Sequence, residues 1–388
     1  MLPIRNINRN LQKVLSQPHY AWSAAKQRFK SYLSYRFLNG RSAYPETLSF
    51  FLNYRCNLRC PMCGQWGDSG AFKDFSSEKL KQNLSLDAVK AVLEDVKDFK
   101  PTITLFGGEP MMHKDWIEIL RCVKTAGLRC NIVTNGTLLS KYAEPIVDLQ
   151  LDEIIFSLDG PREIHDAMRG KPGTFDRALE GFTRLNALKR EQKRKRPLVN
   201  FNCTIYENNY RQLEALLEIA ERVQACSITF HHLLFINSEI NNRHNGIFEA
   251  HFGHRCHEWS GFVRENLPAI DPEVLIEKVK AISRTKSRIR VNFYPNFTPA
   301  EIRSYYTSFE FTSTSYRNRC LSLWMAAYIF PNGDVRPYHS MDYTLGNVQQ
   351  STFKEIWNNE KFQVYRRFIK RNRKFPVCAK GCTEFYRY

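Results

Sequence analysis

Residues 54–64 read Tyr-Arg-Cys-Asn-Leu-Arg-Cys-Pro-Met-Cys-Gly and follow directly on an apolar, β-rich run that starts at Leu48. Cys56, Cys60 and Cys63 thus have the spacing C-x3-C-x2-C, and three thiolates this close together after a strand can converge on one metal centre. Structural zinc sites normally take four protein ligands, whereas iron–sulfur clusters are also held by closely spaced thiolates. Three ligands on a four-iron cluster leave one iron open to a substrate or cofactor. A zinc knuckle or three unrelated buried cysteines are the alternative interpretations.

From residue 48 onward, the sequence alternates between β-rich apolar runs and stretches with helical apolar spacing. The predicted strands are residues 48–55, 102–106, 129–134, 153–158, 198–205 and 227–235, and the predicted helices include residues 86–99, 116–126, 175–188 and 210–223. This alternation indicates βαβ units and a parallel sheet. The sequence therefore predicts an α/β fold with a partial (β/α)6 barrel, whose active site lies at the carboxyl ends of the strands.

Small and polar residues stand where the predicted strands end. After the second strand, Gly107 and Gly108 let a ligand approach the backbone closely, and Glu109 can accept hydrogen bonds from a cationic amine. Each such feature alone is typical of an ordinary strand-to-helix turn, but their order after the cysteine motif indicates one binding site. The later strand ends contribute Asn135, Ser157, Asp159, Arg169 and Asn202.

Over roughly residues 48–235, the cysteine motif and these strand ends resemble the radical S-adenosylmethionine (SAM) superfamily. The resemblance implies that the three cysteines hold a [4Fe-4S] cluster and that SAM chelates its open iron. It further implies that residues 107–109 bind the amino group of SAM. In the same cofactor-binding set, Ser157 and Arg169 would bind the SAM carboxylate and Asn202 the ribose, with Asn135 and Asp159 beside them.

The activity implied by the resemblance is reductive cleavage of SAM to methionine and a 5′-deoxyadenosyl radical, which abstracts a hydrogen from an unactivated carbon of the substrate. The cofactor supplies the difficult chemistry, and the protein positions the carbon and excludes water. An electron donor such as flavodoxin or ferredoxin is the implied partner. The sequence assigns no catalytic acid or base, although one of His231 and His232, on the sixth predicted strand, is expected to point into the barrel.

The C-terminal part of the chain, roughly residues 320–386, resembles a SPASM or shortened twitch domain, which carries auxiliary four-iron clusters. Three of the expected cysteines are present: Cys320, Cys378 and Cys382. Tyr338 stands where a further cysteine is usual. The resemblance implies one auxiliary [4Fe-4S] cluster with three cysteine ligands and an open fourth iron, in preference to a Tyr338 ligand. A structural zinc site or a metal-free remnant are the alternatives.

Four segments are expected along the chain. They are a basic N-terminal extension at residues 1–45, the barrel at 46–235, a variable connecting or substrate segment at 236–319, and a small α+β auxiliary iron–sulfur domain at 320–388. The connecting segment holds His251, His254, Cys256 and His257, whose spacing matches no familiar metal motif; a polar or substrate-facing loop is the expectation there.

The net charge of +18 favours an anionic partner. Residues 1–45 contain eight Lys or Arg, no Asp or Glu, and interleaved aromatic residues. This pattern suits an amphipathic helix on an anionic surface, either a membrane or an acidic partner; a helix packed on the barrel is the alternative. No apolar run reaches the ~20 residues of a membrane span. Cysteines in two tight groups indicate metal binding in a reducing, cytoplasmic compartment.

The substrate class stays open at this point. Oxidation or cross-linking of a peptide or protein is one expectation, and dehydrogenation or epimerisation of a sugar, aminocyclitol or lipid-linked substrate is the other. A non-catalytic nucleic-acid-binding protein with zinc-bound cysteines is a distant alternative, because no recognisable module interleaves aromatic and basic residues as such proteins do.

Overall fold

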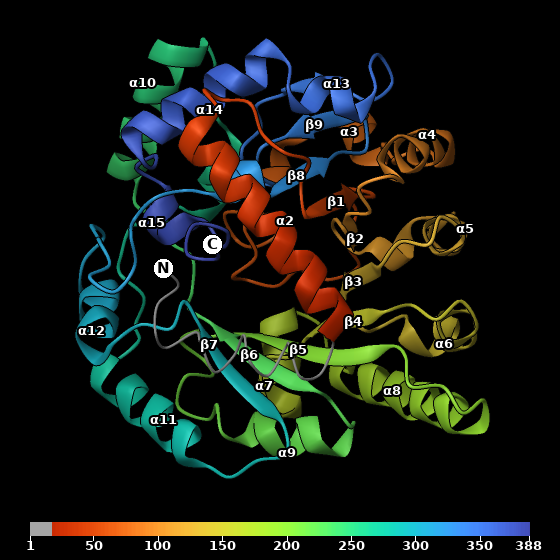
Figure 1. Cartoon of the computed structure of the whole chain (residues 1–388). Helices are drawn as coiled ribbons and strands as arrows, with labels where there is room; N and C mark the ends of the chain where they lie inside the picture. Colours follow the sequence, from red (N-terminus) through yellow and green to blue (C-terminus); the bar gives the residue numbers. More distant parts are fainter. Residues whose placement is uncertain (1–17) are drawn as a thin grey trace.

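The computed structural model describes residues 18–388. Within them, one mixed β-sheet forms the centre of the molecule. Ten strands follow the order β10-β9-β8-β1-β2-β3-β4-β5-β6-β7. All neighbours from β8 through β7 pair in parallel, and β8–β9 and β9–β10 are antiparallel. Figure 1 shows the sheet curving, with helices along its outer side. The predicted α/β partial barrel with a small C-terminal α+β unit is confirmed.

The elements have the following bounds. The strands are β1 (Thr47–Phe51), β2 (Thr102–Phe106), β3 (Cys130–Thr134), β4 (Glu153–Ser157), β5 (Leu198–Thr204), β6 (Ser227–His231), β7 (Arg290–Tyr294), β8 (Ala326–Ile329), β9 (Asp334–Arg336) and β10 (Gly346–Asn347). The α-helices are α2 (Pro18–Phe37), α3 (Ser77–Lys81), α4 (Leu86–Val96), α5 (Trp116–Thr125), α6 (Leu139–Asp148), α7 (Arg162–Arg169), α8 (Thr174–Glu191), α9 (Ala215–Arg222), α10 (Ser238–Phe252), α11 (Pro272–Arg284), α12 (Pro299–Thr307), α13 (Phe353–Trp357), α14 (Glu360–Asn372) and α15 (Cys378–Gly381). Short 3-10 turns include η2 (Ala71–Asp74) and η4 (Glu258–Phe262).

The six predicted strands are present as β1 to β6, and four further strands extend the sheet at both edges. On one side β7 (Arg-Val-Asn-Phe-Tyr) continues the parallel order, in a part of the chain that the sequence assigned to the variable connecting segment. On the other side β8 pairs in parallel with β1, with Thr47 opposite Ala326. This pairing joins segments far apart in the chain, so local sequence patterns do not reveal it.

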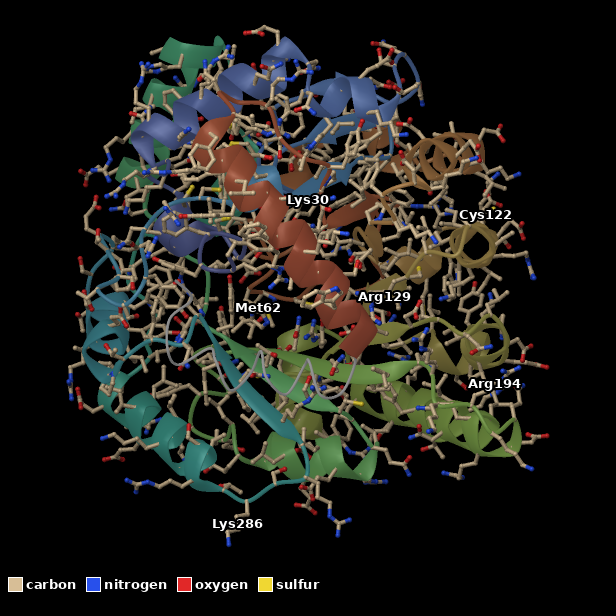
Figure 2. All side chains as sticks on the ribbon, in the orientation of Figure 1. Lys30, Met62, Cys122, Arg129, Arg194 and Lys286 are labelled. Atoms are coloured by element: carbon tan, nitrogen blue, oxygen red, sulfur yellow. The ribbon has the colours of Figure 1, made fainter. Side chains whose placement is uncertain are left out.

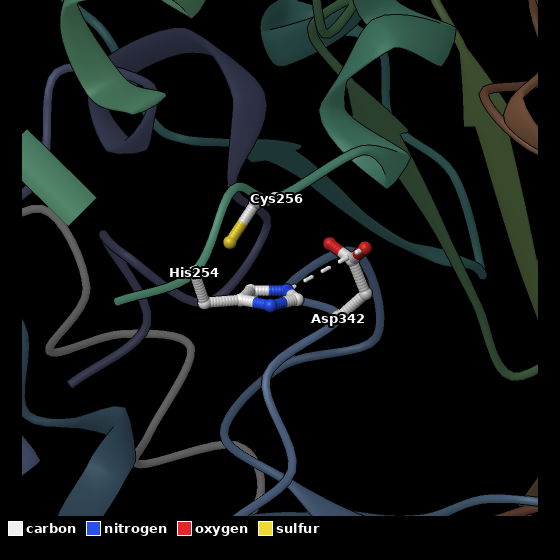
Figure 3. Close-up of side chains that lie close together, drawn as sticks. All are labelled: His254, Cys256 and Asp342. Carbon is white, nitrogen blue, oxygen red and sulfur yellow. Dashed lines mark ion pairs between the residues drawn. The ribbon is translucent and has the colours of Figure 1, made fainter. Parts of the chain in front are cut away.

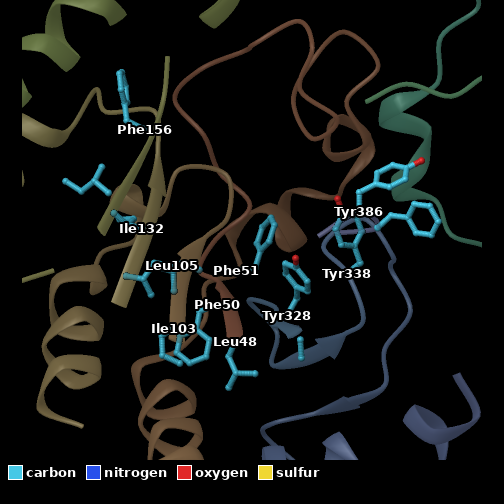
Figure 4. Packing of buried hydrophobic residues seen from close by; sticks show 14 of the residues in the cluster. Leu48, Phe50, Phe51, Ile103, Leu105, Ile132, Phe156, Tyr328, Tyr338 and Tyr386 are labelled. Carbon is cyan, nitrogen blue, oxygen red and sulfur yellow. The ribbon is translucent and has the colours of Figure 1, made fainter. Parts of the chain in front are cut away.

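The strands separate a core face from an inner face. In β4, Ile154 and Phe156 are fully buried, while Ser157 is half-buried; β5 and β6 alternate in the same way. Figure 4 shows Phe50 and Leu105 packed among buried apolar side chains beside the helices. Burial of these apolar groups stabilises the sheet by about 25 cal/mol per Å² removed from water. The alternation turns short polar side chains towards the inside of the barrel.

Helix α2 packs one face against the C-terminal unit. Tyr35 contacts Trp324 edge to face, with ring centroids 4.9 Å apart. Arg28 forms a bidentate ion pair with Glu46, at 2.6 and 2.9 Å. The alternative for the N-terminal extension was a helix packed on the barrel; these contacts instead place α2 against the C-terminal unit and against Glu46, just before β1. Residues 1–17 of that extension lie outside the described part of the chain. None of the helices within residues 18–388 combines the length and apolar character needed to cross a bilayer.

Candidate active site

The cysteine motif forms a compact loop directly after β1. Cys63 N–H donates to the Cys60 carbonyl at 2.9 Å, and Gly67 N–H donates to the Cys63 carbonyl at 2.7 Å. A Cβ on Gly67 would stand 2.4 Å from the Pro61 carbonyl oxygen, so only glycine permits this tight turn. Figure 2 shows Met62, in this loop, inside the ring of helices, whereas Cys122 lies at the outer edge. The three motif thiols are free and half-buried.

The loop cysteines are not among the side chains already spaced to hold a single ion. A tetrahedral zinc ion with bonds of about 2.3 Å holds its sulfur ligands ~3.8 Å apart. Among residues 18–388, only His254, Cys256 and Asp342 bring three such ligand atoms within 4.8 Å of one another. Closely spaced thiolates in one loop are also the ligands of iron–sulfur clusters.

Glu109 is the buried centre of this strand end. Its carboxylate accepts hydrogen bonds from Thr134 Oγ1 at 2.8 Å, Asn135 N at 2.9 Å and Met111 N at 3.1 Å. Only 1% of the residue is exposed, and this burial raises its pKa to about 7 although the donors oppose the shift. Glu109 therefore joins the ends of β2 and β3.

The two glycines before Glu109 allow two backbones to cross. A Cβ on Gly107 would stand 2.7 Å from the Asn53 carbonyl oxygen, and one on Gly108 would stand 2.2 Å from that of Arg55. Glu109 N–H then donates to Arg55 at 2.8 Å. The sequence predicted that a ligand approaches these two glycines closely. In the structure, the chain leading into the cysteine loop makes this close approach, and it holds the loop against the end of β2.

Asn135 links β3 to the same loop. Its amide nitrogen donates to Asn57 Oδ1 at 2.9 Å and lies 3.9 Å from Cys56 Sγ. Its side-chain oxygen, Oδ1, accepts a hydrogen bond from the Thr137 backbone N–H at 3.0 Å. These contacts hold the side chain in one orientation beside the first cysteine.

Asp159 and Arg169 form a buried ion pair. Arg169 Nη2 lies 2.5 Å from Asp159 Oδ2, with the side chains 10% and 0% exposed. Arg169 Nη1 also lies 3.8 Å from Cys60 Sγ, and Asp159 Oδ1 accepts from Thr204 N at 3.1 Å. Burial raises the pKa of Asp159, and the guanidinium opposes this shift. Arg169, at the end of α7, therefore places a positive charge against the cysteine loop.

Ser157 and Asn202 sit side by side at the ends of β4 and β5. They are Cα partners in the parallel register, both half-buried on the inner face. The next strand brings Thr229 beside Asn202 in the same row. The structure thus gathers every predicted cofactor-binding residue at the carboxyl edge of β2 to β5. Their individual contacts with SAM stay predictions.

Burial keeps two thiols of the loop, Cys56 and Cys60, protonated in the absence of a metal. Burial raises the pKa of Cys56 to about 12 and that of Cys60 to about 11; Glu109 adds to the first shift, and Arg169 opposes the second. Both are therefore neutral near pH 7 without a ligand. A bound metal centre displaces these protons because thiolates are its ligands.

The second cysteine group lies in the C-terminal unit. Cys378 begins α15, its Sγ accepts from Phe375 N at 3.4 Å, and Cys320 N–H donates to the Arg373 carbonyl at 2.9 Å. Burial raises the pKa of Cys382 well above its ordinary value, and negative charge on Cys378 and Cys320 raises it further. The three cysteines thus belong to one part of the C-terminal unit, where Cys378 and Cys320 act on the pKa of Cys382.

Tyr338 is already occupied as a hydrogen-bonding group. Its hydroxyl lies 3.0 Å from Thr383 Oγ1 and accepts from Thr383 N at 3.1 Å. Burial raises its pKa well above the ordinary range, so the phenol stays protonated. Nearby, Glu384 pairs with Arg387 at 2.7 Å through one oxygen, while its other oxygen is buried without a hydrogen-bond partner in the described chain. Glu384 follows Cys382 by two positions and belongs to no motif that marks a functional residue in the sequence.

A small cavity lies between the barrel and the second cysteine group. Burial lowers the pKa of His231 to about 4 and that of His232 to about 3, so both imidazoles are neutral at pH 7. His232 Nδ1 lies 3.0 Å from the Tyr306 hydroxyl. The sequence placed His231 and His232 on the sixth strand, but β7 and the chain end supply most of the remaining lining. The lining consists of His231, His232, Leu234, Tyr294, Pro295, Tyr305, Ala379, Cys382, Thr383 and Tyr386.

Comparison with known proteins agrees with this architecture. Residues 51–220 match the radical SAM superfamily, and residues 320–383 match SPASM, an iron–sulfur cluster-binding domain. An AdoMet-dependent heme synthase of Methanosarcina barkeri is 24% identical over 83% of this chain and 84% of its own length. Fe-coproporphyrin III synthase of the same organism is 33% identical over 47% of this chain, but the match spans only 42% of that protein.

Solved structures show the same fold. Streptococcus suis SuiB bound to precursor peptide SuiA has a TM-score of 0.60 at 13% identity, covering 92% of this chain and 72% of SuiB. Native anSMEcpe with bound AdoMet and a peptide has a TM-score of 0.53 at 16% identity, covering 87% of this chain and 89% of anSMEcpe. The two cysteine groups, the parallel partial barrel and these matches agree: the chain is a radical SAM superfamily enzyme with a C-terminal SPASM domain, and its cofactors are SAM, a [4Fe-4S] cluster and an auxiliary iron–sulfur cluster.

Proposed function

We propose that this enzyme oxidises or cross-links a peptide or protein substrate. The position of the cavity lined by His231 and Cys382 carries this proposal, because a substrate carbon held beside it would lie between the barrel and the second cysteine group. The cavity itself is little larger than one water molecule. Its lining is rich in tyrosine, and the His231 imidazole is neutral at pH 7 because burial lowers its pKa to about 4. Two similar folds were solved with peptides bound, and PqqA peptide cyclase of Rhizobium meliloti is 23% identical over 83% of this chain.

Within this proposal, each gathered residue has a task. Cys56, Cys60 and Cys63 would hold the cluster, which with SAM supplies hydrogen abstraction when both are bound. Glu109 would accept the SAM ammonium, with Gly107 and Gly108 presenting backbone groups beside it. The carboxylate of SAM would lie against Ser157 and Arg169, and its ribose against Asn202. The roles of Asn135 and Asp159 would be to orient the cysteine loop and Arg169, respectively.

Binding of SAM is expected to depend on pH through Glu109. Its pKa of about 7 lies above the ordinary carboxyl value because of burial. Below pH 7 the protonated carboxyl cannot pair with an ammonium, so the Kd for SAM should rise as the pH falls, by at most about tenfold per pH unit. Equilibrium dialysis between pH 5.5 and 8 measures this. Glu109→Gln should bind SAM weakly and with a flat profile; a sloped profile in that variant would assign the titration to another group.

The fourth iron of the auxiliary cluster is proposed to be free of Tyr338. Because the phenol is protonated and already bonded to Thr383, Tyr338→Phe should leave iron content and the cluster spectrum nearly unchanged. Iron and sulfide analysis with electron paramagnetic resonance tests this after anaerobic reconstitution. Loss of the auxiliary signal in Tyr338→Phe, with the signal kept in Thr383→Val, would identify Tyr338 as a ligand.

A tetrapyrrole carboxylate is the second candidate substrate. The AdoMet-dependent heme synthases align with this chain across both the barrel and the C-terminal unit, at 24% identity. The net charge of +18 favours such an anionic molecule. The small cavity at His231 and Cys382 offers such an anion no Lys or Arg side chain, because its lining contains none.

Substrate-stimulated turnover separates the two candidates. The assay contains reconstituted enzyme, SAM and a reductant, which is either dithionite or the proposed flavodoxin or ferredoxin system. A peptide pool or iron-coproporphyrin is added as the substrate. Chromatography measures the 5′-deoxyadenosine that forms. The peptide proposal expects stimulation and hydrogen loss, by mass spectrometry, with peptides alone. Thr383→Phe, which fills the cavity, should keep substrate-free SAM cleavage but lose the stimulation. Stimulation by iron-coproporphyrin alone would reject the peptide proposal.

We also propose that α2 contacts an anionic membrane surface. Besides its packed face it exposes Trp22, Phe29 and Phe37, at 76%, 62% and 73%, and Lys26 and Lys30 lie exposed on the same helix. Co-sedimentation with anionic and neutral liposomes tests this. Binding to anionic vesicles should be lost in the triple variant Trp22→Ser, Phe29→Ser, Phe37→Ser. Equal sedimentation of that variant and the parent would reject a membrane role for this face.

A further inference from the structure

We propose that His254, Cys256 and Asp342 form a mononuclear Zn²⁺ site, separate from both cysteine groups. One ligand atom from each residue lies within 4.8 Å of the other two. The residues come from two segments: His254 and Cys256 follow α10, and Asp342 lies in the loop after β9. Figure 3 shows the three side chains converging on one point. The sequence left the 251–257 group as a polar loop because Asp342 is distant along the chain.

The geometry leaves each side chain available to an ion. His254 Nε2 lies 3.9 Å from Asp342 Oδ2, too far for a hydrogen bond, and it has no hydrogen-bond partner among the described residues. Cys256 is 1% exposed, and its thiol points at the thioether of Met341, with the sulfur atoms 3.3 Å apart. Tetrahedral zinc with bonds of about 2.0–2.3 Å separates its ligand atoms by ~3.3–3.8 Å, so small side-chain shifts close the site.

Backbone contacts already hold two of these residues in place. The Asp342 carboxylate accepts from the backbone N–H groups of His257 at 3.0 Å and Glu258 at 3.4 Å. Cys256 N–H donates to Asn245 Oδ1 at 2.8 Å. Such supporting contacts orient metal ligands and strengthen binding. Three protein ligands leave a fourth position for water.

The donor set selects the metal. One imidazole nitrogen, one thiolate and one carboxylate oxygen match the ligands that Zn²⁺ takes in proteins. Binding replaces the Cys256 S–H bond by a sulfur–zinc bond and releases one proton to solvent, with no change of oxidation state. Because the thiol must lose its proton to bind the ion, zinc affinity should fall as the pH falls.

The location gives the site a function. The chain runs from Cys256 directly into η4, whose Gly261 packs so tightly on Gly64 that a Cβ would stand 1.9 Å from the Gly64 carbonyl oxygen. Trp259 of η4 stacks on Tyr338, with centroids 5.7 Å apart. A zinc ion would therefore tie the segment that covers the Cys63–Gly64 turn to the C-terminal unit, fixing the lid of the SAM cluster loop against the auxiliary site.

Metal binding to the reconstituted holoenzyme tests the site. The protein is equilibrated anaerobically with Zn²⁺ or Co²⁺, desalted, and analysed for metal per chain, and Co²⁺ absorption reports thiolate ligation. One zinc per chain is expected beyond the iron, together with a thiolate-to-cobalt band. His254→Gln and Asp342→Asn should each weaken binding more than about tenfold, and Cys256→Ser should remove the band.

Two matched variants serve as controls. His257→Ala removes a neighbouring, exposed imidazole outside the set, and Cys122→Ser removes a remote thiol; both should bind zinc like the parent. Zinc should raise the unfolding temperature of the parent and of both controls but not that of His254→Gln. The unfolding temperature of metal-free His254→Gln, compared with that of the metal-free parent, shows whether the substitution itself disturbs folding. Less than half a zinc per chain in the parent, or an unchanged cobalt band in Cys256→Ser, would overturn the proposal.

Discussion

Replacing Cys56, Cys60 and Cys63 together by Ala is expected to abolish reductive cleavage of SAM. Without these thiolates no cluster is held at the end of β1, so SAM lacks the iron that receives and delivers the electron. Formation of 5′-deoxyadenosine by anaerobically reconstituted enzyme with a strong reductant measures this, even without substrate. Activity should fall to the no-enzyme background. Cys122→Ser, which removes a thiol at the edge of α5, should leave the rate unchanged.

The same triple variant also reports on the second cysteine group. If Cys320, Cys378 and Cys382 hold a cluster, the variant should retain about four irons per chain, with the spectrum of the auxiliary cluster alone. If iron analysis finds no iron in the triple variant, the C-terminal cysteine group binds no cluster. If the triple variant forms 5′-deoxyadenosine at the parent's rate, the three loop cysteines are not needed for SAM cleavage.

Arg169→Ala is expected to lower the free energy of unfolding by about 3–5 kcal/mol, because it strands a buried carboxylate. Asp159 is 0% exposed and lies 2.5 Å from the guanidinium, and burial alone raises its pKa. Denaturant unfolding of the apoprotein measures the loss. Stability of Arg169→Ala should improve as the pH falls, since protonating Asp159 removes the unpaired charge.

A double variant separates structure from cofactor binding at this pair. Asp159→Leu combined with Arg169→Met replaces the ions by apolar side chains and should recover most of the stability. It should still bind SAM poorly, because the proposed carboxylate partner is gone. Tight SAM binding by the double variant would restrict Arg169 to a structural role. Unchanged stability in Arg169→Ala would show that Asp159 is already neutral in the parent.

Local signals were enough to predict the barrel strands and the cysteine loop. Strands β1 to β6 are rich in apolar and β-branched residues, and in β4 the buried side chains Ile154 and Phe156 recur at every second position. The C-x3-C-x2-C spacing acts within eight residues of one loop, so its ability to gather three thiols needs no distant partner. The position of Glu109 was also predictable, because it follows a strand and the carboxyl ends of barrel strands form the active-site edge.

Contacts between distant segments could not be predicted in this way. Gly107 and Gly108 are small because the chain at Asn53 and Arg55 crosses them, a requirement visible only once β1 and β2 are paired. The partner of Arg169 is set by how α7 packs over the end of β4. The meeting of Cys256 with Asp342 depends on two loops that lie 86 positions apart in the sequence.

Chemistry carried by short motifs was therefore readable from the residues alone: the cysteine loop, the order of the strand ends that carry the predicted SAM-binding residues, and the second cysteine group. Tertiary structure decided which charges are buried, which thiols share a site, and what lines the cavity between the barrel and the SPASM domain. The physical reason is that burial, pKa and ligand distance are properties of surroundings, and those surroundings are assembled by β7, β8 and the chain end from remote parts of the sequence.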